Sequence, residues 1–320
     1  MKIILSGSLE KSSSTVVFMK KALEGLGQKV VPFDYRRERR ELGNEKMQAR
    51  MIDTVRQEKP DVFLLVKGEG ISPATLLEIR KTCHASLRYM DSPIPRWLVR
   101  LGREADSFFV TAGGLRDKYR RLGFNNVHHL WEGCDPEVHR YIESDSSLYR
   151  CEVAFVGTNK AGREQLLRQV KKRGFQVKIW GSPSWPDDLP YQGELRDSEN
   201  FARVCSGAEI VLGLNDKQTI PDYFSDRTFL TLACRGFHLT SYVPGLEKWF
   251  TDREHLVWFP LGKGWKNRYR ECLQLLDYYR EKPEERKRIA AAGQKHVYAH
   301  YTWQQSMEKM LGILSELLKS

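Results

Sequence analysis

The sequence predicts an α/β protein of two domains, each built on a parallel β-sheet flanked by helices. At 320 residues the chain is longer than one hydrophobic core usually serves. Short apolar runs of strand length alternate with segments of helical spacing, which is the pattern of β-α-β units and parallel sheets. The alternation stops at the polar stretch 141–150 and then restarts. We therefore expect a first domain over residues 1–148 and a second over 149–301.

Six apolar runs are the expected strands of the first domain. In chain order they are KIILSG, KVVPFD, PDVFLLVKGEG, SLRYMDSP, SFFVTAGG and NVHHL. Helical spacing marks SSTVVFMKKALEGLGQ, residues 45–58 and SPATLLEIRKT, where Ser72 is the expected N-cap and Pro73 the first helical residue. The basic run 36–40 follows the second strand and is interpreted as a solvated loop. The alternative is contact with an acceptor or an anionic surface.

The second domain repeats the alternation. Its expected strands are CEVAFVGTN, QVKIWG, AEIVLGLN, GFHLT and HLVWF, and its first helix is GREQLLRQVKKRG. Helical stretches over residues 266–300 and 302–319 close the chain. We expect both domains to be Rossmann-like. Ligands of such sheets bind at the carboxyl ends of the strands, so the expected site is a cleft between the two domains.

The composition limits the class of partner. Lys and Arg exceed Asp and Glu by 11, which favours an anionic partner such as a nucleotide, a phosphorylated acceptor, nucleic acid or acidic lipid. The acids are interspersed among the bases, and no tail of one sign indicates nucleic-acid binding. Six cysteines without a C-x-x-C pair indicate reduced thiols. With no signal-like or membrane-spanning run, we expect a cytoplasmic protein with membrane contact at most peripheral.

Missing motifs exclude several kinds of site. No G-x-G-x-x-G follows a strand, and neither a P-loop ending nor a G-x-S-x-G elbow occurs. His128, His129 and His139 lie near Cys134, but their spacing matches no standard zinc pattern. We therefore expect no metal and assign these side chains to strand-end and loop packing. Asp135 is expected to anchor a turn.

The stretch PDYFSDRTFLTLACRG (221–236) is a candidate phosphate site. It follows the strand AEIVLGLN and opens a short apolar helix, with Ser225 as the expected N-cap. Free N–H groups of the first turn and the helix dipole favour an anion there, and the planar guanidinium of Arg227 suits phosphate oxygens. The alternative is that Ser225 caps the helix and Arg227 pairs with Asp222 or Asp226. The donor-binding residues expected here are Ser225, Asp226, Arg227 and Thr228.

Two further loops are candidates for ligand contact. The segment FVGTNKAGREQLL (155–167) is the first βα turn of the second domain, where nucleotide phosphates usually dock, unless it is a plain surface loop. Asp91, in RYMDSPIPRW, precedes two prolines that stiffen its loop. Its carboxylate is expected to hold a sugar hydroxyl or an acceptor proton, or else to anchor an Asx-type turn. The contacts expected in the first loop are Gly157, Thr158, Lys160 and Arg163.

Taken together, the segments resemble the CgeB-type spore-maturation glycosyltransferases. The likeness lies in KPDVFLLVKGEGISPATLLEIR, YMDSP, VAFVGTNKAGREQLL, SDRTFLTLACRGFHLTSYVPGLEKWF and KPEERKRIAAAGQKHVYAHYTWQQSMEKML, so it covers most of the chain in order. The resemblance implies the two-domain GT-B fold, related to retaining glycosyltransferase family 4. It also implies that the first domain holds the acceptor and the second the nucleotide-sugar donor, and that the helix within 302–320 packs back on the first domain.

The resemblance assigns roles to particular residues. Ser225, Arg227 and Phe229 match the family's Ser-x-Arg-x-Phe-Glu segment, and Asp222 matches the first acid of the related E-x7-E pattern. The second acid, which holds the donor's ribose hydroxyls in relatives, would fall at residue 230, where this chain has Leu230. The family's glycine after the Ala-Cys pair is delayed by one position, to residue 236.

We therefore expect a glycosyltransferase that moves a sugar from a nucleotide-diphospho-sugar to a sugar, polysaccharide or protein acceptor. Its expected catalytic residues are Arg227, Asp91 and Asp222, with Arg227 stabilising the leaving diphosphate. The resemblance implies retention of configuration, no active-site metal and no tightly bound cofactor. Trp185 or Tyr191 is expected to stack on the base. Leu230 favours one alternative, a non-catalytic GT-B-like binding or spore-coat assembly protein; another is a nucleotide-sugar epimerase or hydrolase.

Overall fold

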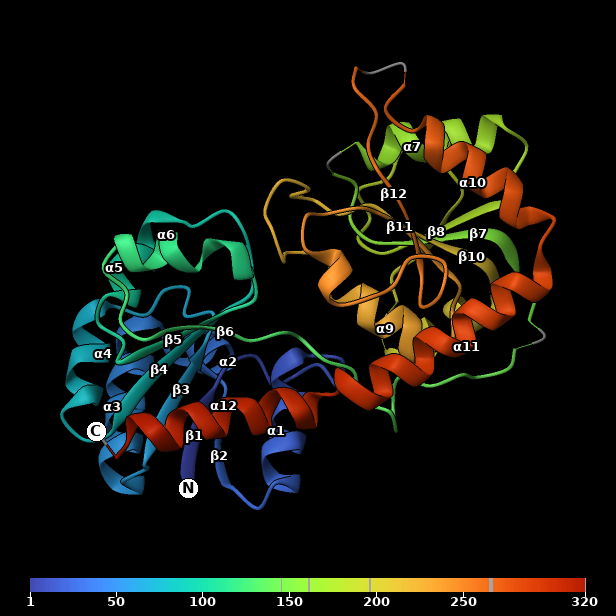
Figure 1. Cartoon of the computed structure of the whole chain (residues 1–320). Coiled ribbons are helices and arrows are strands. Elements are labelled where there is room, and N and C mark those ends of the chain that lie inside the picture. The colour runs from blue at the N-terminus through green and yellow to red at the C-terminus, as the bar shows by residue number, and fades with distance from the viewer. Residues whose placement is uncertain (145, 161, 196, 265–266, 320) are drawn as a thin grey trace. The chain divides into compact units, whose positions relative to one another are not determined.

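The computed structural model describes residues 1–144, 146–160, 162–195, 197–264 and 267–319. The chain forms two units: Met1–Glu132 together with the residues from Trp303 onward, and Gly133–Thr302. Each unit contains a six-stranded sheet, and the strand pairs of the described residues are all parallel (Figure 1). This α/β architecture confirms the fold class predicted from the alternating pattern.

The first sheet has the strand order β2-β1-β3-β4-β5-β6. Its strands are β1 (Lys2–Ser6), β2 (Lys29–Phe33), β3 (Val62–Val66), β4 (His84–Tyr89), β5 (Ser107–Val110) and β6 (Val127–His129). All five residues of β3 are buried, which explains its unbroken apolar sequence. β2 pairs with one side of β1, and β3 to β6 follow one another on the other side of β1. The strand order therefore reverses between β1 and β3.

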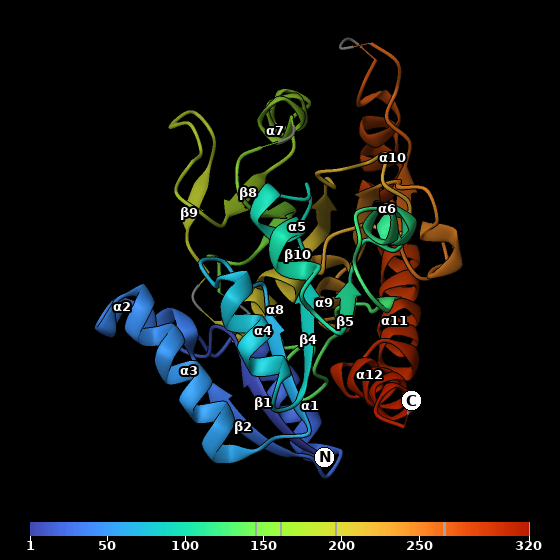
Figure 2. The same ribbon diagram turned by 90° about the vertical axis from the view of Figure 1, so that its left-hand side faces the viewer.

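Helices cover the first sheet and begin at recognisable caps. They are α1 (Thr15–Gly25), α2 (Tyr35–Leu42), α3 (Asn44–Glu58), α4 (Pro73–Arg80), α5 (Arg96–Gly102) and α6 (Arg116–Arg121). The predicted cap of α4 is confirmed, because Ser72 Oγ accepts a hydrogen bond from Thr75 N at 3.1 Å and Pro73 is the first helical residue. α3 packs against both α2 and α4 (Figure 2).

The basic run 36–40 lies on helix α2, so its prediction as a solvated loop is wrong. Asp34 caps the helix, and its carboxylate accepts hydrogen bonds from Arg36 N and Arg37 N. The buried carboxylate of Glu38 forms an ion pair with Arg50 of α3 at 3.1 Å. A strong cap and a cross-helix partner therefore offset the repulsion among the arginines.

The second sheet has the strand order β12-β11-β10-β7-β8-β9. Its strands are β7 (Cys151–Val156), β8 (Val177–Trp180), β9 (Tyr191–Gly193), β10 (Ala208–Gly213), β11 (His238–Ser241) and β12 (Val257–Phe259). Five of these match predicted runs. The exception is β9, a three-residue edge strand too short to stand out in the sequence. This is the doubly wound order, which reverses between β7 and β10.

The helices of the second unit are α7 (Arg163–Lys172), α8 (Ser198–Gly207), α9 (Arg227–Ala233), α10 (Arg270–Arg280) and α11 (Pro283–His300). The predicted helical stretch 266–300 therefore contains two helices. Pro283 begins α11, because a proline restricts the residue before it and is tolerated in a first turn. Residues of the expected linker 141–150 lie in this unit, where Tyr149 Oη donates to Asn200 Oδ1 at 2.6 Å.

The last helix, α12 (Trp303–Leu317), belongs to the first unit and packs against α1 (Figure 1). The ring of Trp303 lies 5.5 Å from the guanidinium carbon of Arg88, a fully buried residue of β4. Ser306 Oγ donates to the carbonyl of Trp131 at 2.8 Å, and Arg88 Nη2 donates to the same carbonyl at 3.0 Å. α12 thus completes the core of the first unit.

Gly181, which directly follows β8, allows the loop after β7 to approach closely. Its φ is 131°, and a Cβ there would lie 2.3 Å from Gly157 O. Gly174 also has a positive φ, of 89°, but nothing lies within 4 Å of its would-be Cβ. We expect Gly174→Ala to lower the free energy of unfolding by about 1 kcal/mol through backbone strain alone. Gly181→Ala should cost a further ~1–3 kcal/mol because the clash is with backbone.

Urea denaturation of the two glycine variants checks this expectation. Equal losses of stability would contradict the close approach of residues 157 and 181.

Candidate functional site

The reversal of strand order between β7 and β10 defines the candidate site in the second unit. Ligands of doubly wound sheets bind where the order reverses, beyond the carboxyl ends of the strands. The loop that begins at Gly157 follows β7, and the segment from Leu214 to Asp226 follows β10. Both loops contain residues singled out from the sequence.

Arg163 ties these two loops together. Its Nε and Nη2 donate to Leu214 O at 3.1 and 2.9 Å, and its Nη1 donates to Thr158 O at 2.9 Å. The residue is only 3% exposed. Burial lowers the pKa of the Arg163 guanidinium to about 10, with the nearby charge of Arg227 as the second cause. Arg163 is therefore placed as a buried brace, whereas the sequence predicted a phosphate contact.

A small pocket opens beside this brace. Its walls come from the ends of β7 and β10, from β11, from α8 and from the start of α9, and they include Asn215, Ser225 and Arg227. The cavity volume is about 20 Å³, enough for the centre of about one water molecule. Among the described residues that line it there is no carboxylate. The guanidinium groups of Arg163 and Arg227 therefore both line this pocket, and no carboxylate of a described lining residue offsets their charge.

The start of α9 differs from the prediction. The N-cap is Asp226, whose Oδ1 accepts from Arg227 N at 2.8 Å, while the expected cap, Ser225 Oγ, is 3.4 Å away. Thr228 N donates to Ser225 O at 2.9 Å, and Ser225 N donates to Asn215 Oδ1 at 3.0 Å. The predicted free N–H groups at residues 225, 227 and 228 are thus bonded within the chain. The reason is that the carboxylate of Asp226 reaches the first N–H better than the shorter serine hydroxyl.

The side chain of Arg227 remains available. It is half-buried, and the described part of the chain provides no hydrogen bond or ion pair to its guanidinium. The pairing with Asp222 that was the structural alternative does not occur. Asp222 instead lies 3.2 Å from Lys248 Nζ and accepts from Trp249 Nε1 at 3.3 Å. Asp222, an expected catalytic residue, is therefore engaged in joining its loop to the segment around residue 248.

The other predicted contacts of the loop after β7 have partners in the chain. Lys160 Nζ lies 3.2 Å from Asp216 Oδ2, and the lysine side chain is 53% exposed. Gly157 N donates to Trp180 O, and Gly157 O accepts from Trp185 Nε1 at 3.1 Å. Trp185 is buried in the core, so the prediction that it stacks on a base is not supported by its position.

His238 lines the same pocket and was not singled out from the sequence. It is buried on β11, and its Nδ1 lies 3.0 Å from Val211 O. Because a carbonyl only accepts, Nδ1 carries the proton and Nε2 is an acceptor, 3.5 Å from Thr228 Oγ1. Burial, with the charge of Arg227 as a smaller cause, lowers the pKa of His238 to about 4. The available signal was a histidine between Phe237 and Leu239 in a short predicted strand.

Leu230 of α9 packs on a cluster of buried side chains instead of reaching toward polar groups. The cluster consists of Phe201, Ala202, Cys205, Val211 and Cys234. The surroundings of residue 230 are thus apolar, in keeping with the leucine that replaces the acid of the family pattern.

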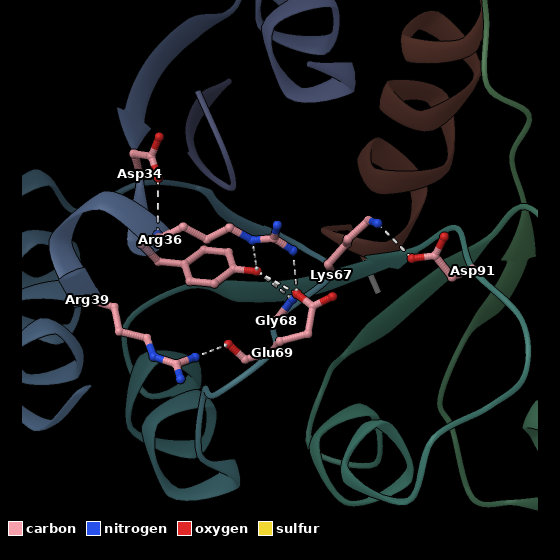
Figure 3. Close-up of polar contacts among 8 residues, drawn as sticks. Asp34, Arg36, Arg39, Lys67, Gly68, Glu69 and Asp91 are labelled. Carbon is pink, nitrogen blue, oxygen red and sulfur yellow. Dashed lines mark hydrogen bonds and ion pairs between the residues drawn. The ribbon is translucent and has the colours of Figure 1, made fainter. Parts of the chain in front are cut away.

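In the first unit, Asp91 lies in a group of charged side chains at the carboxyl edge of the sheet (Figure 3). Lys67 Nζ is 2.7 Å from Asp91 Oδ2, and Arg36 Nη2 is 2.8 Å from Glu69 Oε2. Tyr35 Oη also donates to Glu69 Oε2 at 2.8 Å. Lys67 has a φ of 70°, which turns the chain sharply after β3. These loops follow β2, β3 and β4 and present two exposed ion pairs on one edge.

Of the three histidines near Cys134, His139 serves the turn predicted at Asp135, while His128 and His129 lie on strand β6. Glu137 N donates to Asp135 Oδ1 at 3.0 Å, and Asp135 N donates to His139 Nδ1 at 3.0 Å, which confirms the turn anchor. Within the described ranges, no group of three or more His, Cys, Asp or Glu side chains has an arrangement that could hold a metal ion. No helix in these ranges has the length and apolar character needed to cross a membrane.

Comparison with known proteins places these features in context. Residues 162–312 match the family described as "Glycosyl transferase-like". The spore protein CgeB of Bacillus subtilis (strain 168) is 22% identical over 291 residues, covering 80% of this chain and 87% of that protein. Sucrose-phosphate synthase from Thermosynechococcus elongatus has a TM-score of 0.71 at 13% identity, over 100% of both chains. HepE of Anabaena in complex with UDP-glucose has a TM-score of 0.71 at 12% identity, and the match covers 99% of this chain and 100% of HepE.

These likenesses confirm the resemblance to CgeB-type proteins and the GT-B fold that it implied. The family match spans α7, α9 and most of the pocket beside Arg163, and it supports the predicted class of enzyme, a glycosyltransferase.

The buried neutral state of His238 predicts a dependence of stability on pH. The pKa of this group is about 4 in the folded chain and near its ordinary value of 6.5 when unfolded, so the unfolded chain binds the proton more tightly. The stability it contributes is therefore complete above pH 6.5 and is lost as pH falls toward 4. Lowering the pH from 7.5 to 5 should reduce the free energy of unfolding of the parent chain. In His238→Gln the same change of pH should reduce it by about 2 kcal/mol less.

Urea denaturation at the two pH values measures this difference, with the exposed His300→Gln as the matched control. An identical loss in the parent and in His238→Gln would contradict the assignment.

Proposed function

We propose that the chain transfers a sugar from a nucleotide-diphospho-sugar donor to a hydroxyl of an acceptor, with the donor's diphosphate held beside Arg227. The observation that carries this proposal is the half-buried guanidinium of Arg227, which has no anionic partner in the described chain and shares its pocket wall with Arg163. Two like charges at the point where the strand order reverses favour an anionic ligand. HepE, which shares the fold, has been solved with UDP-glucose.

The proposed chemistry is cleavage of the bond between the sugar's C1 and the oxygen of the diphosphate. Negative charge then builds on the leaving diphosphate, and a preorganised guanidinium stabilises that charge more in the transition state than in the ground state. Arg227 supplies this stabilisation. Lys160, which is half-exposed and paired with Asp216, can exchange that partner for phosphate. We assign Arg163 a positioning role, because its donors already hold Leu214 O and Thr158 O.

The further features of the proposal come from the resemblance. They are retention of configuration, chemistry without an active-site metal, and an acceptor held by the first unit. Asp91 is the proposed acceptor contact: its side chain is 51% exposed, and its ion pair with Lys67 leaves lone pairs free for a hydroxyl.

A non-catalytic role is the second candidate, because Leu230 packs on apolar side chains where relatives hold ribose with an acid. Calorimetry with a panel of nucleoside diphosphates separates the two. Binding of none of them by the folded protein would favour the non-catalytic role.

Replacing Arg227 tests the enzyme directly. Arg227→Ala should lower turnover of a nucleotide-sugar, by transfer or by hydrolysis of the donor alone, by about 100-fold or more. Arg203→Ala, which removes a partly exposed arginine of α8 paired with Glu199, is the matched control and should retain turnover. Circular dichroism and denaturation confirm that both variants are folded. Parental turnover in Arg227→Ala would remove this residue from the mechanism.

Replacing Asp91 tests the acceptor contact separately. Asp91→Asn should raise KM for the acceptor by about 10-fold or more through loss of a charge-assisted hydrogen bond, and should leave hydrolysis of the donor unchanged. Asp117→Asn removes another ion-paired carboxylate of the same unit, whose side chain is 83% exposed, and serves as the control. A fall in donor hydrolysis with an unchanged KM for the acceptor would contradict the assignment.

A further inference from the structure

A second pocket lies at the opposite edge of the second sheet, where β10 and β11 begin. Its cavity volume is about 420 Å³, within the range of small-molecule sites and far above the 20 Å³ beside Arg227. It is lined by segments that are distant in the sequence, from Tyr141, the end of α8, the starts of the two strands and the first turns of α11. None of its lining residues belongs to the proposed donor site.

The charged groups of this pocket are mostly positive. Three cationic residues line it, namely Arg235, Arg286 and Lys287, against one carboxylate, Glu209. Lys287 is exposed and pairs with Glu284 at 2.8 Å. Arg235 forms no ion pair with a described residue, and its guanidinium lies over the ring of Tyr141 at 5.7 Å. The pocket therefore has an excess of positive charge beside an aromatic face.

Arg286 is the fixed part of the wall. It is only 9% exposed, and its Nη2 lies 2.7 Å from Glu209 Oε2. Its Nη1 donates to the carbonyls of Tyr279 and Arg280. A guanidinium has five N–H donors, so donors remain beyond these three bonds. The buried arginine is thus oriented by the chain before any ligand arrives.

Arg235 occupies a backbone conformation that favours glycine. Its φ is 58°, in the left-handed region, directly after the end of α9. The next residue, Gly236, has no room for a Cβ, which would lie 2.9 Å from Thr231 Cγ2. The family's glycine comes one residue later here, so an arginine stands in a strained backbone conformation where the chain turns into the pocket.

We propose that this pocket is a second ligand site, which binds a small organic phosphate through Arg235 and Arg286 and stacks the apolar part of that ligand on Tyr141. A phosphate monoester carries up to two negative charges at neutral pH, which suits the excess of cations, and arginine forks match its oxygens. The half-exposed ring of Tyr141 and the apolar atoms of Phe237, Pro283 and Ala290 offer a surface for a flat group. The site is independent of the proposed transfer reaction.

The test is calorimetric titration of the full chain with phenyl phosphate and with inorganic phosphate. We expect saturable binding of phenyl phosphate, weakened about 10-fold or more by Arg235→Gln through loss of a charge-assisted bond. Arg253→Gln is the matched control, since Arg253 is an exposed arginine of the same unit with a φ of 60°. Tyr141→Ala should weaken phenyl phosphate but not inorganic phosphate. Urea denaturation verifies that each variant is folded.

Arg227→Gln separates this site from the proposed donor site. Binding of phenyl phosphate that survives Arg227→Gln but is weakened by Arg235→Gln supports the second pocket, whether or not the chain proves to be a transferase. Binding abolished by Arg227→Gln and unchanged by Arg235→Gln overturns the proposal and places the probe at the donor site. Absence of saturable binding in the folded parent chain also overturns it.

Discussion

The hydrogen bonds of the buried Arg163 guanidinium are the interaction on which the carboxyl edge of the second unit's sheet depends. It donates to the carbonyls of Leu214 and Thr158, and the Leu214 carbonyl would otherwise be a buried acceptor costing about 1–3 kcal/mol. Those carbonyls belong to the two loops between which the strand order reverses. One side chain therefore fixes the spacing of the loops and, with it, the position of the pocket wall formed by Asn215 and Arg227.

The hydrogen bonds of Arg163 give it a different role from Arg227. Arg163 donates to backbone carbonyls, whereas the guanidinium of Arg227, which lines the same pocket, has no hydrogen-bond partner among the described residues. Burial is the first cause of the lowered pKa of Arg163, and the like charge of Arg227 adds to it. The neighbouring imidazole of His238 is kept neutral by burial, so it adds no further positive charge. An anion bound here would offset the repulsion between the two guanidinium groups, which is a form of preorganisation.

The strands and the overall class were predictable because burial on both faces of a parallel sheet leaves continuous apolar runs. Ser72 and Pro73 were equally readable, since a cap followed by proline acts locally. Helix α2 was not, because its stability rests on the capping carboxylate of Asp34 and on an ion pair from another helix. The different roles of Arg163 and Arg227 were not predictable either. The carbonyl that accepts from Arg163 Nε belongs to Leu214, which lies 51 residues away in the sequence.

The placement of α12 has a consequence for how the protein is made on the ribosome. The first unit is complete only when a helix from the far end of the chain packs on α1 and covers Arg88. Residues 1–132 therefore emerge early, yet their apolar face stays uncovered while some 170 residues of the other unit are translated. At about 5–20 residues per second this interval is of the order of ten seconds or more, long enough for chaperones to engage the nascent chain.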